Sequence, residues 1–499
     1  MNASSYAVRI GAQGRQLVSV DNFSVAANAI TFLFGESGIG KSIIAKALYG
    51  LLNPAEFDIA INNQPYRDHL NDPWTRAVRH NSFFVFQEPS SHLNPLMKIK
   101  DQLREGSLVS TEHEQLILEQ LWEKAPAETI RSITNLFPKP YRPSGGEKQR
   151  ILLAMAFKKI SAYTGKDAAT GPALFVFDEP TGSLDNTYRN LFLTMLFNRF
   201  HEKKFTALII THDYSIISEV YGSHRDLSPH VLYHELSRTG DATVAVNDFS
   251  PQSYLGWLSS ITGAKQDATG GKPLLTIKPD FTIFNKKMRV CGDPVAKTPA
   301  PLIIGKGETV YLKAQSGVGK TTLAKIVMGL YKAQNFSMDF MDRIIDHTSP
   351  QEVWQQEIWG KKAGLVFQHA DEALNLQATV QETFAGLPLR TPLTMQGLKQ
   401  RLEELFEGEI TDAFLSKKVA FLSGGQKQRL NLLRTLILDT SLIILDEPLN
   451  GLDFASIKKV LALLEKKRRQ GASFLMISHN EEIFDAFVEK TKVYYLTAL

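Results

Sequence analysis

The sequence predicts an α/β protein in which two copies of one domain follow each other along the chain. Three observations support this prediction. The composition is globular, five short motifs each occur twice in the same order, and some of them follow apolar runs that fit buried parallel strands. With 499 residues, either half is long enough to bury a core of its own.

The composition excludes several classes of protein. Hydrophobic residues make up 43% and charged residues 22%, which excludes disordered and collagen-like chains. The formal charge of +4 is too weak for a dedicated nucleic-acid binder, so no nucleic-acid partner is expected. The single cysteine, Cys291, cannot form an internal disulfide and fits a reducing compartment. We find neither a signal-peptide pattern nor a long apolar stretch, so any membrane role must come through partners.

The repeat defines the expected domains. The number of residues between a motif and its match in the other half changes once. The first half carries an insertion around Ser161–Pro172, which we expect to be a surface loop before a strand. Residues 262–273 have the composition of a linker, so the domains are expected at 1–261 and 274–499. The segment 222–260 joins the first domain without an assigned role.

Each half contains an apolar strand, a glycine-rich turn and a helix, the context that predicts a phosphate-binding loop. Glycines let the backbone N–H groups turn inward toward an anion. The lysine of each loop is expected to reach the ATP phosphates, and the following hydroxyl to ligate Mg²⁺. Ala314 replaces the first glycine of the second loop and requires a negative φ. The loops comprise Gly35, Glu36, Ser37, Gly38, Ile39, Gly40, Lys41 and Ser42, and Ala314, Gln315, Ser316, Gly317, Val318, Gly319, Lys320 and Thr321.

Two carboxylates follow an apolar strand in each half. A run of apolar residues fits a parallel strand covered on both faces, so the acids are expected at the carboxyl edge of the sheet, where α/β proteins bind ligands. Asp178 and Asp446 are predicted to hold Mg²⁺. Glu179 and Glu447, one residue later, are predicted to act as general bases on the attacking water.

Two further residue types end strands in register with these motifs. Gln87 and Gln368 are expected to touch Mg²⁺ or the attacking water. His212 and His479 are expected to hydrogen-bond the γ-phosphate. Alone, either histidine would be read as an ordinary strand-end residue; the shared register favours the catalytic role.

A Ser-Gly-Gly sequence opens a helix in each half and predicts a second anion-binding helix N-terminus. Each half already has a phosphate loop for its own nucleotide. We therefore expect the Ser-Gly-Gly helix end of one half to bind the nucleotide of the other half. The residues are Ser144, Gly145 and Gly146, and Ser423, Gly424 and Gly425.

Together these motifs resemble an ATP-binding cassette (ABC) ATPase with two fused nucleotide-binding domains, over essentially the whole chain. The resemblance implies two tandem P-loop NTPase domains. Each would have a RecA-like parallel-sheet core, an antiparallel β subdomain and an α-helical subdomain. It also implies that the two domains pair head to tail around ATP and Mg²⁺, and that both sites hydrolyse ATP. Asp185 and Asp453 match the D-loop of that family, while Pro143 replaces its usual leucine before Ser-Gly-Gly.

The residues after Gln87, which include Leu93, Asn94 and Pro95, are similar to those of oligopeptide, dipeptide and nickel importer ATPases. That similarity implies a peripheral protein on the cytoplasmic face of the inner membrane. Its partners would be two transmembrane permease subunits and an extracytoplasmic solute-binding protein. Peptides, nickel, metal chelates and similar small solutes all stay open as cargo.

Two alternatives stay open as well. A soluble tandem ABC ATPase acting on the ribosome would have a longer charged linker and a different D-loop sequence. The fused ATPase of an energy-coupling vitamin importer fits the Leu-Asn positions less well.

The candidates for stacking on the adenine ring are Phe284, Tyr6 and Phe23. A strand or core position is the simpler interpretation of each of these aromatic residues.

Overall fold

The computed structural model describes residues 3–105, 109–123, 125–137, 143–164, 171–182, 186–240, 242–262, 272–315, 317–389 and 391–499. The chain divides into two compact units, Met1–Tyr254 and Leu255–Leu499. The division falls inside helix α10 (Pro251–Ile261), ahead of the expected linker, of which residues 263–271 lie outside the described residues. Each unit is described by itself below.

The first unit is built on a six-stranded sheet with the order β10-β9-β3-β8-β7-β6. β9, β3, β8, β7 and β6 are parallel, and β10 is added antiparallel to β9. Every residue of β3 and β7 is buried, as expected for strands covered on both faces. The strands are β3 (Ile30–Gly35), β6 (Phe84–Val85), β7 (Leu174–Asp178), β8 (Thr206–Ile210), β9 (Val231–Arg238) and β10 (Val244–Asp248).

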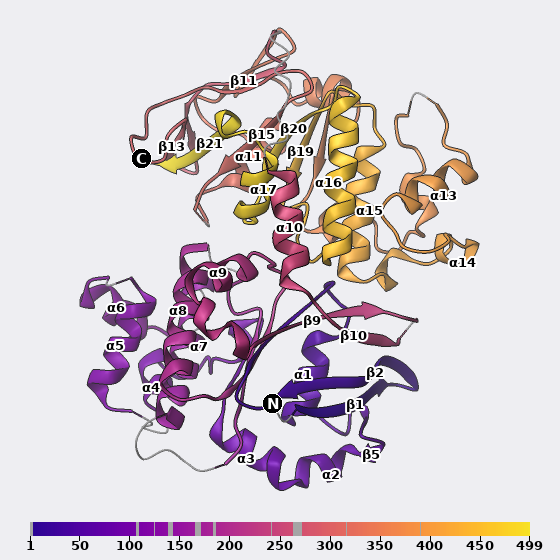
Figure 1. Cartoon of the computed structure of the whole chain (residues 1–499). Coiled ribbons are helices and arrows are strands. Elements are labelled where there is room, and N and C mark those ends of the chain that lie inside the picture. Colours follow the sequence, from indigo (N-terminus) through magenta and orange to yellow (C-terminus); the bar gives the residue numbers. More distant parts are fainter. Residues whose placement is uncertain are drawn as a thin grey trace. The chain divides into compact units, whose positions relative to one another are not determined.

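Helices follow these strands and surround the sheet of the first unit (Figure 1). α1 leaves β3 directly, so the turn between them becomes a loop at the carboxyl edge of the sheet. The helices are α1 (Lys41–Tyr49), α7 (Gly145–Thr164), α8 (Asn186–Glu202), α9 (Ile216–Ser223) and the short η2 (Arg225–His230). α7 continues through Thr164, so the expectation of a loop from Ser161 is wrong for its first residues, and residues 165–170 lie outside the described residues.

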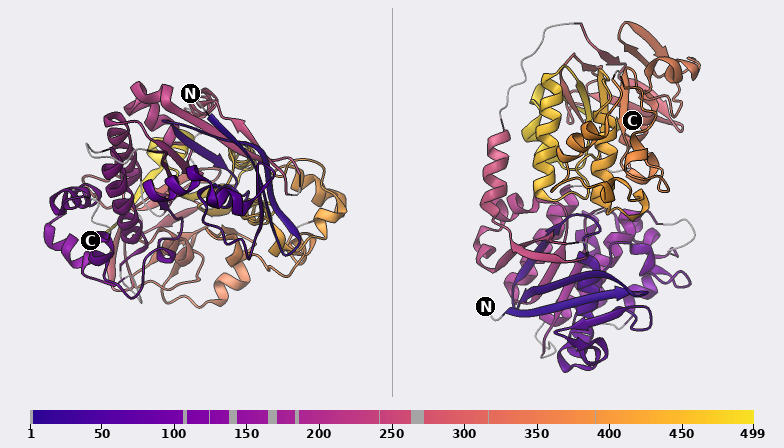
Figure 2. Two further views of the ribbon diagram at one scale, coloured as in Figure 1. Left: turned by 90° about the horizontal axis from the view of Figure 1, so that it is seen from below. Right: turned by 90° about the vertical axis from the view of Figure 1, so that its right-hand side faces the viewer.

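A second sheet and a group of helices complete the first unit. The sheet is antiparallel, with the order β2-β1-β4-β5, and Figure 2 shows its long strands β1 and β2 side by side. α4, α5 and α6 lie together at one edge of the unit, beside α7 (Figure 1). The elements are β1 (Ala3–Ala12), β2 (Arg15–Ala26), β4 (Asp58–Ile61), β5 (Gln64–Pro65), α2 (Tyr66–Asn71), α3 (Pro73–Asn81), η1 (Pro89–Ser91), α4 (Ile99–Arg104), α5 (Thr111–Leu121) and α6 (Ala127–Thr134).

The second unit repeats this plan. Its main sheet has the order β12-β13-β21-β15-β20-β19-β18, in which β21, β15, β20, β19 and β18 are parallel. Its antiparallel sheet has the order β14-β11-β16-β17. The strands are β11 (Leu275–Ile277), β12 (Asp280–Ile283), β13 (Lys286–Cys291), β14 (Leu302–Ile304), β15 (Thr309–Lys313), β16 (Ser337–Phe340), β17 (Arg343–Asp346), β18 (Ala363–Val366), β19 (Leu442–Asp446), β20 (Ser473–Ile477) and β21 (Val493–Ala498).

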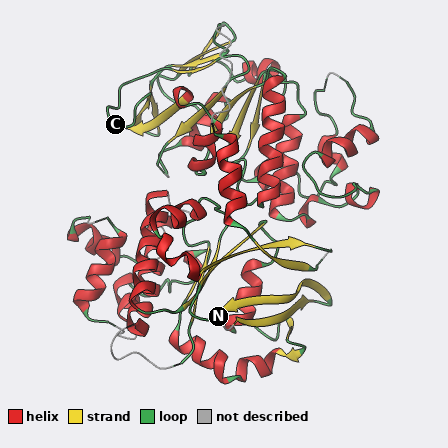
Figure 3. Ribbon diagram, viewed as in Figure 1, coloured by secondary structure: helices red, strands yellow, loops and turns green. Residues whose placement is uncertain are grey.

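The helices of the second unit again flank its main sheet, and Figure 3 separates helices from strands by colour. They are α11 (Lys320–Val327), η3 (Trp354–Ile358), α12 (Ala370–Ala373), η4 (Gln381–Phe384), α13 (Met395–Glu403), α14 (Asp412–Leu415), η5 (Val419–Phe421), α15 (Gly424–Leu436), α16 (Phe454–Arg469), α17 (Glu481–Phe487) and η6 (Lys490–Lys492). The expected tandem α/β architecture is therefore confirmed. No helix in the described ranges combines the length and the apolar character needed to cross a membrane.

Candidate functional site

The first phosphate loop joins β3 to α1. Gly35, Gly38 and Gly40 have φ values of 138°, 79° and 117°, which side chains with a Cβ rarely adopt. A Cβ on Gly40 would also lie 2.9 Å from the Val18 side chain. Gly40 caps α1 without a side-chain hydrogen bond, so the backbone N–H groups at the helix N-terminus are left for an anion.

Lys41 is 6% exposed and lies inside this loop. Its Nζ donates to the carbonyl oxygens of Gly35 at 2.6 Å and Glu36 at 3.0 Å. The loop therefore holds the ammonium group at its centre, where a phosphate would replace neutral carbonyl partners with a negative charge.

The second loop has the same construction. Gly317 and Gly319 have φ values of 77° and 120°, and Lys320 donates to the Ala314 carbonyl at 2.6 Å. Ala314 stands where the first loop has Gly35, and an alanine there requires a negative φ. Ala314 is not among the described residues with positive φ, so this requirement is met. Lys320 Nζ also lies 3.4 Å from Nδ1 of His479. Ser316 lies outside the described residues.

Oxygen atoms suited to Mg²⁺ gather beside both loops. Ser42 Oγ donates to Asp178 Oδ1 at 2.9 Å. Burial raises the pKa of Asp178 to about 6, while the hydrogen bond from Ser42 acts in the opposite direction. Burial likewise raises the pKa of Asp446, whose hydrogen bond from the Thr321 hydroxyl lowers it. A cation between hydroxyl and carboxylate would remove the cost of burying these charges.

One buried atom supports this fit directly. Asp446 is 2% exposed, and its Oδ1 has no hydrogen-bond partner. An unpaired carboxylate oxygen is costly to bury, and a hydrated Mg²⁺ would satisfy it. Gln368 also contributes, because its Oε1 lies 3.5 Å from Thr321 Oγ1. Among the described residues, no three His, Cys, Asp or Glu side chains are arranged so that they could hold a metal ion by themselves. Hydroxyl and amide oxygens would therefore complete the coordination of Mg²⁺ here.

The two predicted general bases share a strained backbone. Glu179 and Glu447 have φ values of 48° and 50°, in the left-handed region that non-glycine residues rarely occupy. The amide of each donates to the neighbouring strand, Glu179 to Ile210 and Glu447 to Ile477, both at 2.9 Å. The positive φ and this hydrogen bond to the neighbouring strand together turn each glutamate out of its own strand. This happens at the edge of the sheet where the phosphate loop lies.

In the first unit, the predicted histidine contacts the predicted base. His212 Nδ1 lies 2.9 Å from Glu179 Oε1. Burial opposes protonation of His212, but the adjacent Glu179 carboxylate outweighs it, so the pKa of His212 is raised. The two strand ends β7 and β8 therefore join their side chains into one ionisable pair.

In the second unit, the base has different partners. Ser478 Oγ donates to Glu447 Oε2 at 2.8 Å, and the His479 backbone N–H donates to the same oxygen at 3.1 Å. The His479 ring is more distant, with Nε2 3.7 Å from Oε1. Burial raises the pKa of Glu447 to about 7, against the lowering effect of these hydrogen bonds. Ser478 was not singled out by the sequence; its place directly before the histidine was the available signal.

Both Ser-Gly-Gly sequences open helices. Ser423 caps α15: its Oγ accepts from Gln426 N–H at 3.1 Å, and the Gln426 side chain accepts from Ser423 N–H. Ser144 makes the same reciprocal pair with Glu147 ahead of α7. Ser144 and Gly145 are exposed, so this helix end is accessible to an anion.

The structure describes most, but not all, of the remaining predicted residues. Asp453 caps α16 by accepting from Ser456 N–H at 2.7 Å, whereas Asp185 lies outside the described residues. Gln87 is exposed beyond β6. Phe23 is 1% exposed and belongs to the core, while Phe284 is 77% exposed in a turn. Tyr6 packs against Trp74, with the ring centroids 6.0 Å apart.

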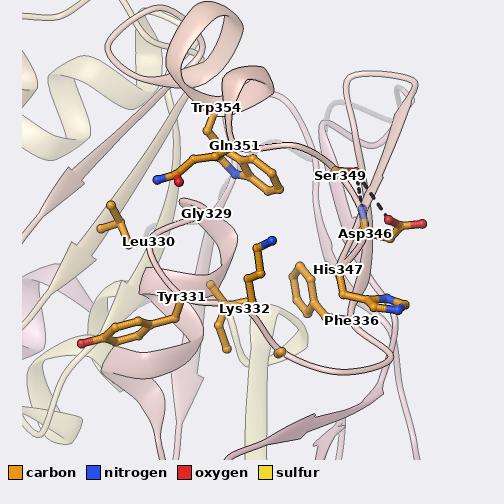
Figure 4. Close-up of a pocket in the computed structure, with 12 residues that line it drawn as sticks. Gly329, Leu330, Tyr331, Lys332, Phe336, Asp346, His347, Ser349, Gln351 and Trp354 are labelled. Atoms are coloured by element: carbon orange, nitrogen blue, oxygen red, sulfur yellow. Dashed lines mark hydrogen bonds between the residues drawn. The ribbon is translucent and has the colours of Figure 1, made fainter.

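A cavity of about 140 Å³ lies at the other end of α11, away from Lys320. Figure 4 shows the Trp354 and Phe336 rings at its wall and the Lys332 side chain extending into it. Trp354 Nε1 donates to the Val327 carbonyl at 3.0 Å, and a Cβ on Gly329 would lie 2.4 Å from the indole. At the equivalent turn of the first unit, Leu70 and Thr75 pack around Gly50.

Comparison with known proteins agrees with this geometry. The family model described as ABC transporter matches residues 18–182 and 299–450, more than half of the chain. The uncharacterized ABC transporter ATP-binding protein YejF of Escherichia coli (strain K12) is 27% identical over 503 residues, covering 95% of this chain and 89% of that protein. The glutathione import ATP-binding protein GsiA of the same strain is 25% identical over 530 residues, covering 95% and 81%.

Solved structures are similar over nearly the whole chain. A solved structure of RNase-L Inhibitor has a TM-score of 0.59 at 17% identity, covering 98% of this chain and 89% of that one. The archaeal ribosome recycling factor aABCE1, solved with the ribosomal stalk protein aP1, has a TM-score of 0.60 at 18% identity, covering 96% and 87%. At these identities the likeness establishes the fold alone.

Proposed function

Because the chain belongs to the ABC transporter family as a tandem pair of ATPase domains, we propose that it drives uptake of peptides or peptide-like solutes. The relatives named above include a glutathione import protein, and they cover nearly the whole chain. The observation that carries the proposal is the duplicated constellation of loop lysine, strand-end carboxylates and histidine, which is complete in both units.

The chemistry proposed for each site follows from its side chains. Lys41 and Lys320 hold the ATP phosphates together with the loop N–H groups. Ser42 with Asp178, and Thr321 with Asp446 and Gln368, would hold Mg²⁺, which neutralises phosphate charge when it is bound. Gln87 is assigned to the same function in the first unit.

Glu179 and Glu447 are proposed to accept the proton of the attacking water. The strained backbone aims each carboxylate out of its strand, and His212 or Ser478 fixes its orientation. His212 and His479 are proposed to hydrogen-bond the γ-phosphate, and His479 Nδ1 already lies near Lys320 Nζ. Both sites keep a base, so both are expected to turn over ATP.

We further propose that the Ser-Gly-Gly helix ends of one unit complete the nucleotide site of the other. Each unit already has a phosphate loop of its own, and the N-terminus of α7 or α15 would donate N–H groups to the γ-phosphate. Asp185 and Asp453 are assigned to the D-loops. In this scheme, ATP closes the pair and hydrolysis reopens it.

The proposed partners are two permease subunits in the membrane and a solute-binding protein outside it. The chain would then lie peripherally on the cytoplasmic face of the inner membrane. We propose that a side chain of a permease subunit binds in the cavity beside α11 of the second unit. Because α11 begins at Lys320 and ends against that cavity, a shift at the nucleotide would reach it through a rigid helix.

Copurification tests this proposal. The tagged chain is isolated from detergent-solubilised membranes of its native host, with the Lys41→Ala, Lys320→Ala double variant as a control for nucleotide dependence. We expect two polytopic membrane proteins in the eluate, and peptide uptake that the double variant abolishes. One transmembrane scaffold with a small vitamin-binding module would indicate the energy-coupling class instead. Ribosomal proteins without membrane proteins would overturn the transport role.

A further inference from the structure

The hairpin formed by β9 and β10 belongs to the segment 222–260, to which the sequence assigned no role. β9 pairs in parallel with β3, in a register that places Leu236 beside Gly35, the first residue of the phosphate loop. Two residues later, the exposed Arg238 reaches the loop itself. Its Nη2 donates to the Gly38 carbonyl at 3.2 Å.

The hairpin is held in this position by the antiparallel sheet of the first unit. Ser19 N–H of β2 donates to the Ala242 carbonyl beside β10 at 2.7 Å, and Ser19 also forms a bridge with Thr243. The adjacent Val18 is the side chain against which Gly40 packs. Arg238 and Val18 therefore contact the loop at Gly38 and Gly40, two of its positive-φ glycines.

The second unit offers a comparison at the same register. Phe34, the residue before the first loop, pairs with Glu235, and Lys313, the residue before the second loop, pairs with Tyr495. The counterpart of Arg238 is therefore Ala498, which has no group that could reach a loop carbonyl.

Packing around the second loop differs in the same way. A Cβ on Gly319 would approach only Thr322 of its own helix, and one on Gly317 would meet nothing within 4 Å. At these two described glycines, the second loop has no contact equivalent to that between Val18 and Gly40.

We propose that Arg238 is a positioning residue that presets the first phosphate loop for ATP and makes it the tighter of the two nucleotide sites. A glycine-rich segment loses conformational freedom when it closes on a phosphate. The hydrogen bond from the Arg238 guanidinium to the Gly38 carbonyl already restricts this segment, so less freedom is lost when ATP binds. It also adds a positive charge beside an anion site. The inference rests on the proposed role of this loop in binding ATP.

Binding of a fluorescent ATP analogue, TNP-ATP, to the full chain tests this inference. A Lys320→Ala background weakens the second site, so that the titration reports the first. There, Arg238→Ala is expected to raise the Kd by about 3- to 10-fold, the effect of one charge-assisted hydrogen bond at an exposed position. Arg238→Lys should recover part of the loss, because it keeps the charge without the planar donor group.

The matched control is Arg225→Ala, which removes the same charge from an exposed position ahead of β9. It should leave the Kd unchanged, and neither variant should lower the unfolding temperature without nucleotide. In ATPase assays, Arg238→Ala should raise KM for ATP and spare kcat, because Arg238 donates to the carbonyl of Gly38 in the nucleotide-binding loop. An unchanged Kd for Arg238→Ala, or an equal loss for Arg225→Ala, would overturn the inference. Absence of any binding in the Lys320→Ala background would instead contradict the nucleotide-binding role of the loop itself.

Discussion

The two units place the same glutamate on the same strained turn but hold it differently. In the first unit, the His212 side chain contacts Glu179 at 2.9 Å. In the second, Ser478 and the His479 backbone hold Glu447, and the imidazole is 3.7 Å away. The difference teaches that a repeated motif conserves the backbone position of a catalytic side chain more strictly than its hydrogen-bond partners.

The largest expected effect tests whether both sites are active. Glu179→Gln and Glu447→Gln should each remove the turnover of one site, and the double variant should lower ATPase activity by about 10²- to 10⁴-fold, because no general base is left. Steady-state phosphate release measures this, with Glu128→Gln, an exposed residue of α6, as the control. If one single variant kept full turnover, the site carrying that glutamate would be degenerate.

The next effect concerns affinity. Lys41→Ala and Lys320→Ala should each weaken ATP binding at its own site by roughly 10- to 100-fold, the value of a charge-assisted hydrogen bond to phosphate. Isothermal titration with ATP and Mg²⁺ measures both sites in the full chain. Two unchanged binding isotherms would contradict the assignment of the loops.

A third effect distinguishes the units by stability. Arg189, 8% exposed, pairs with Asp213 at 3.0 Å, and the motif spacing places Ile457 and Asn480 at these positions in the second unit. Asp213→Asn should leave the Arg189 charge unpaired and destabilise the first unit by roughly 2–3 kcal/mol, less than a fully buried pair because Asp213 is 23% exposed. Asn480→Asp is the matched change in the second unit, where no such arginine exists at the aligned position.

The pH dependence of this pair has a defined sign. Burial opposes ionisation of Asp213, but Arg189 and the hydrogen bonds from Ser215 together outweigh it and hold the pKa of Asp213 below its usual value. The folded pKa is therefore below the unfolded one. The contribution to stability is present above the unfolded pKa of about 3.9 and is lost as pH falls through the folded value. Urea unfolding of wild type and Asp213→Asn should converge at acid pH; a constant difference would contradict the ion pair.

The smallest effect isolates the partner of Glu447. Ser478→Ala removes the hydroxyl that orients the carboxylate and should lower second-site turnover by about 3- to 10-fold. Thr211→Ala is its counterpart in the first unit, where Thr211 Oγ1 accepts from Asp213 N–H and makes no hydrogen bond to Glu179. It should therefore leave turnover nearly unchanged. Both are measured in a background where the other site carries its Glu→Gln change, and equal losses would show that the two glutamates are held alike.

Much of the fold could be predicted because it depends on local patterns. The buried runs of β3 and β7, and the glycines before Lys41, fix strands, turns and helix starts through short-range geometry, and the repeat extends each assignment to the second unit. The end of α7 could not be predicted, since its last turn extends into a stretch with the composition of a loop.

The sequence by itself determined the tandem α/β architecture, the two phosphate loops and the carboxylates that follow their strands, because each is encoded by neighbouring residues. Only the tertiary structure decided which side chains meet across strands: His212 on Glu179, Ser478 on Glu447, and Arg238 on Gly38 from 200 residues away. Those contacts depend on the register of parallel strands and on side-chain reach across them. Neither leaves a periodic signal along the chain.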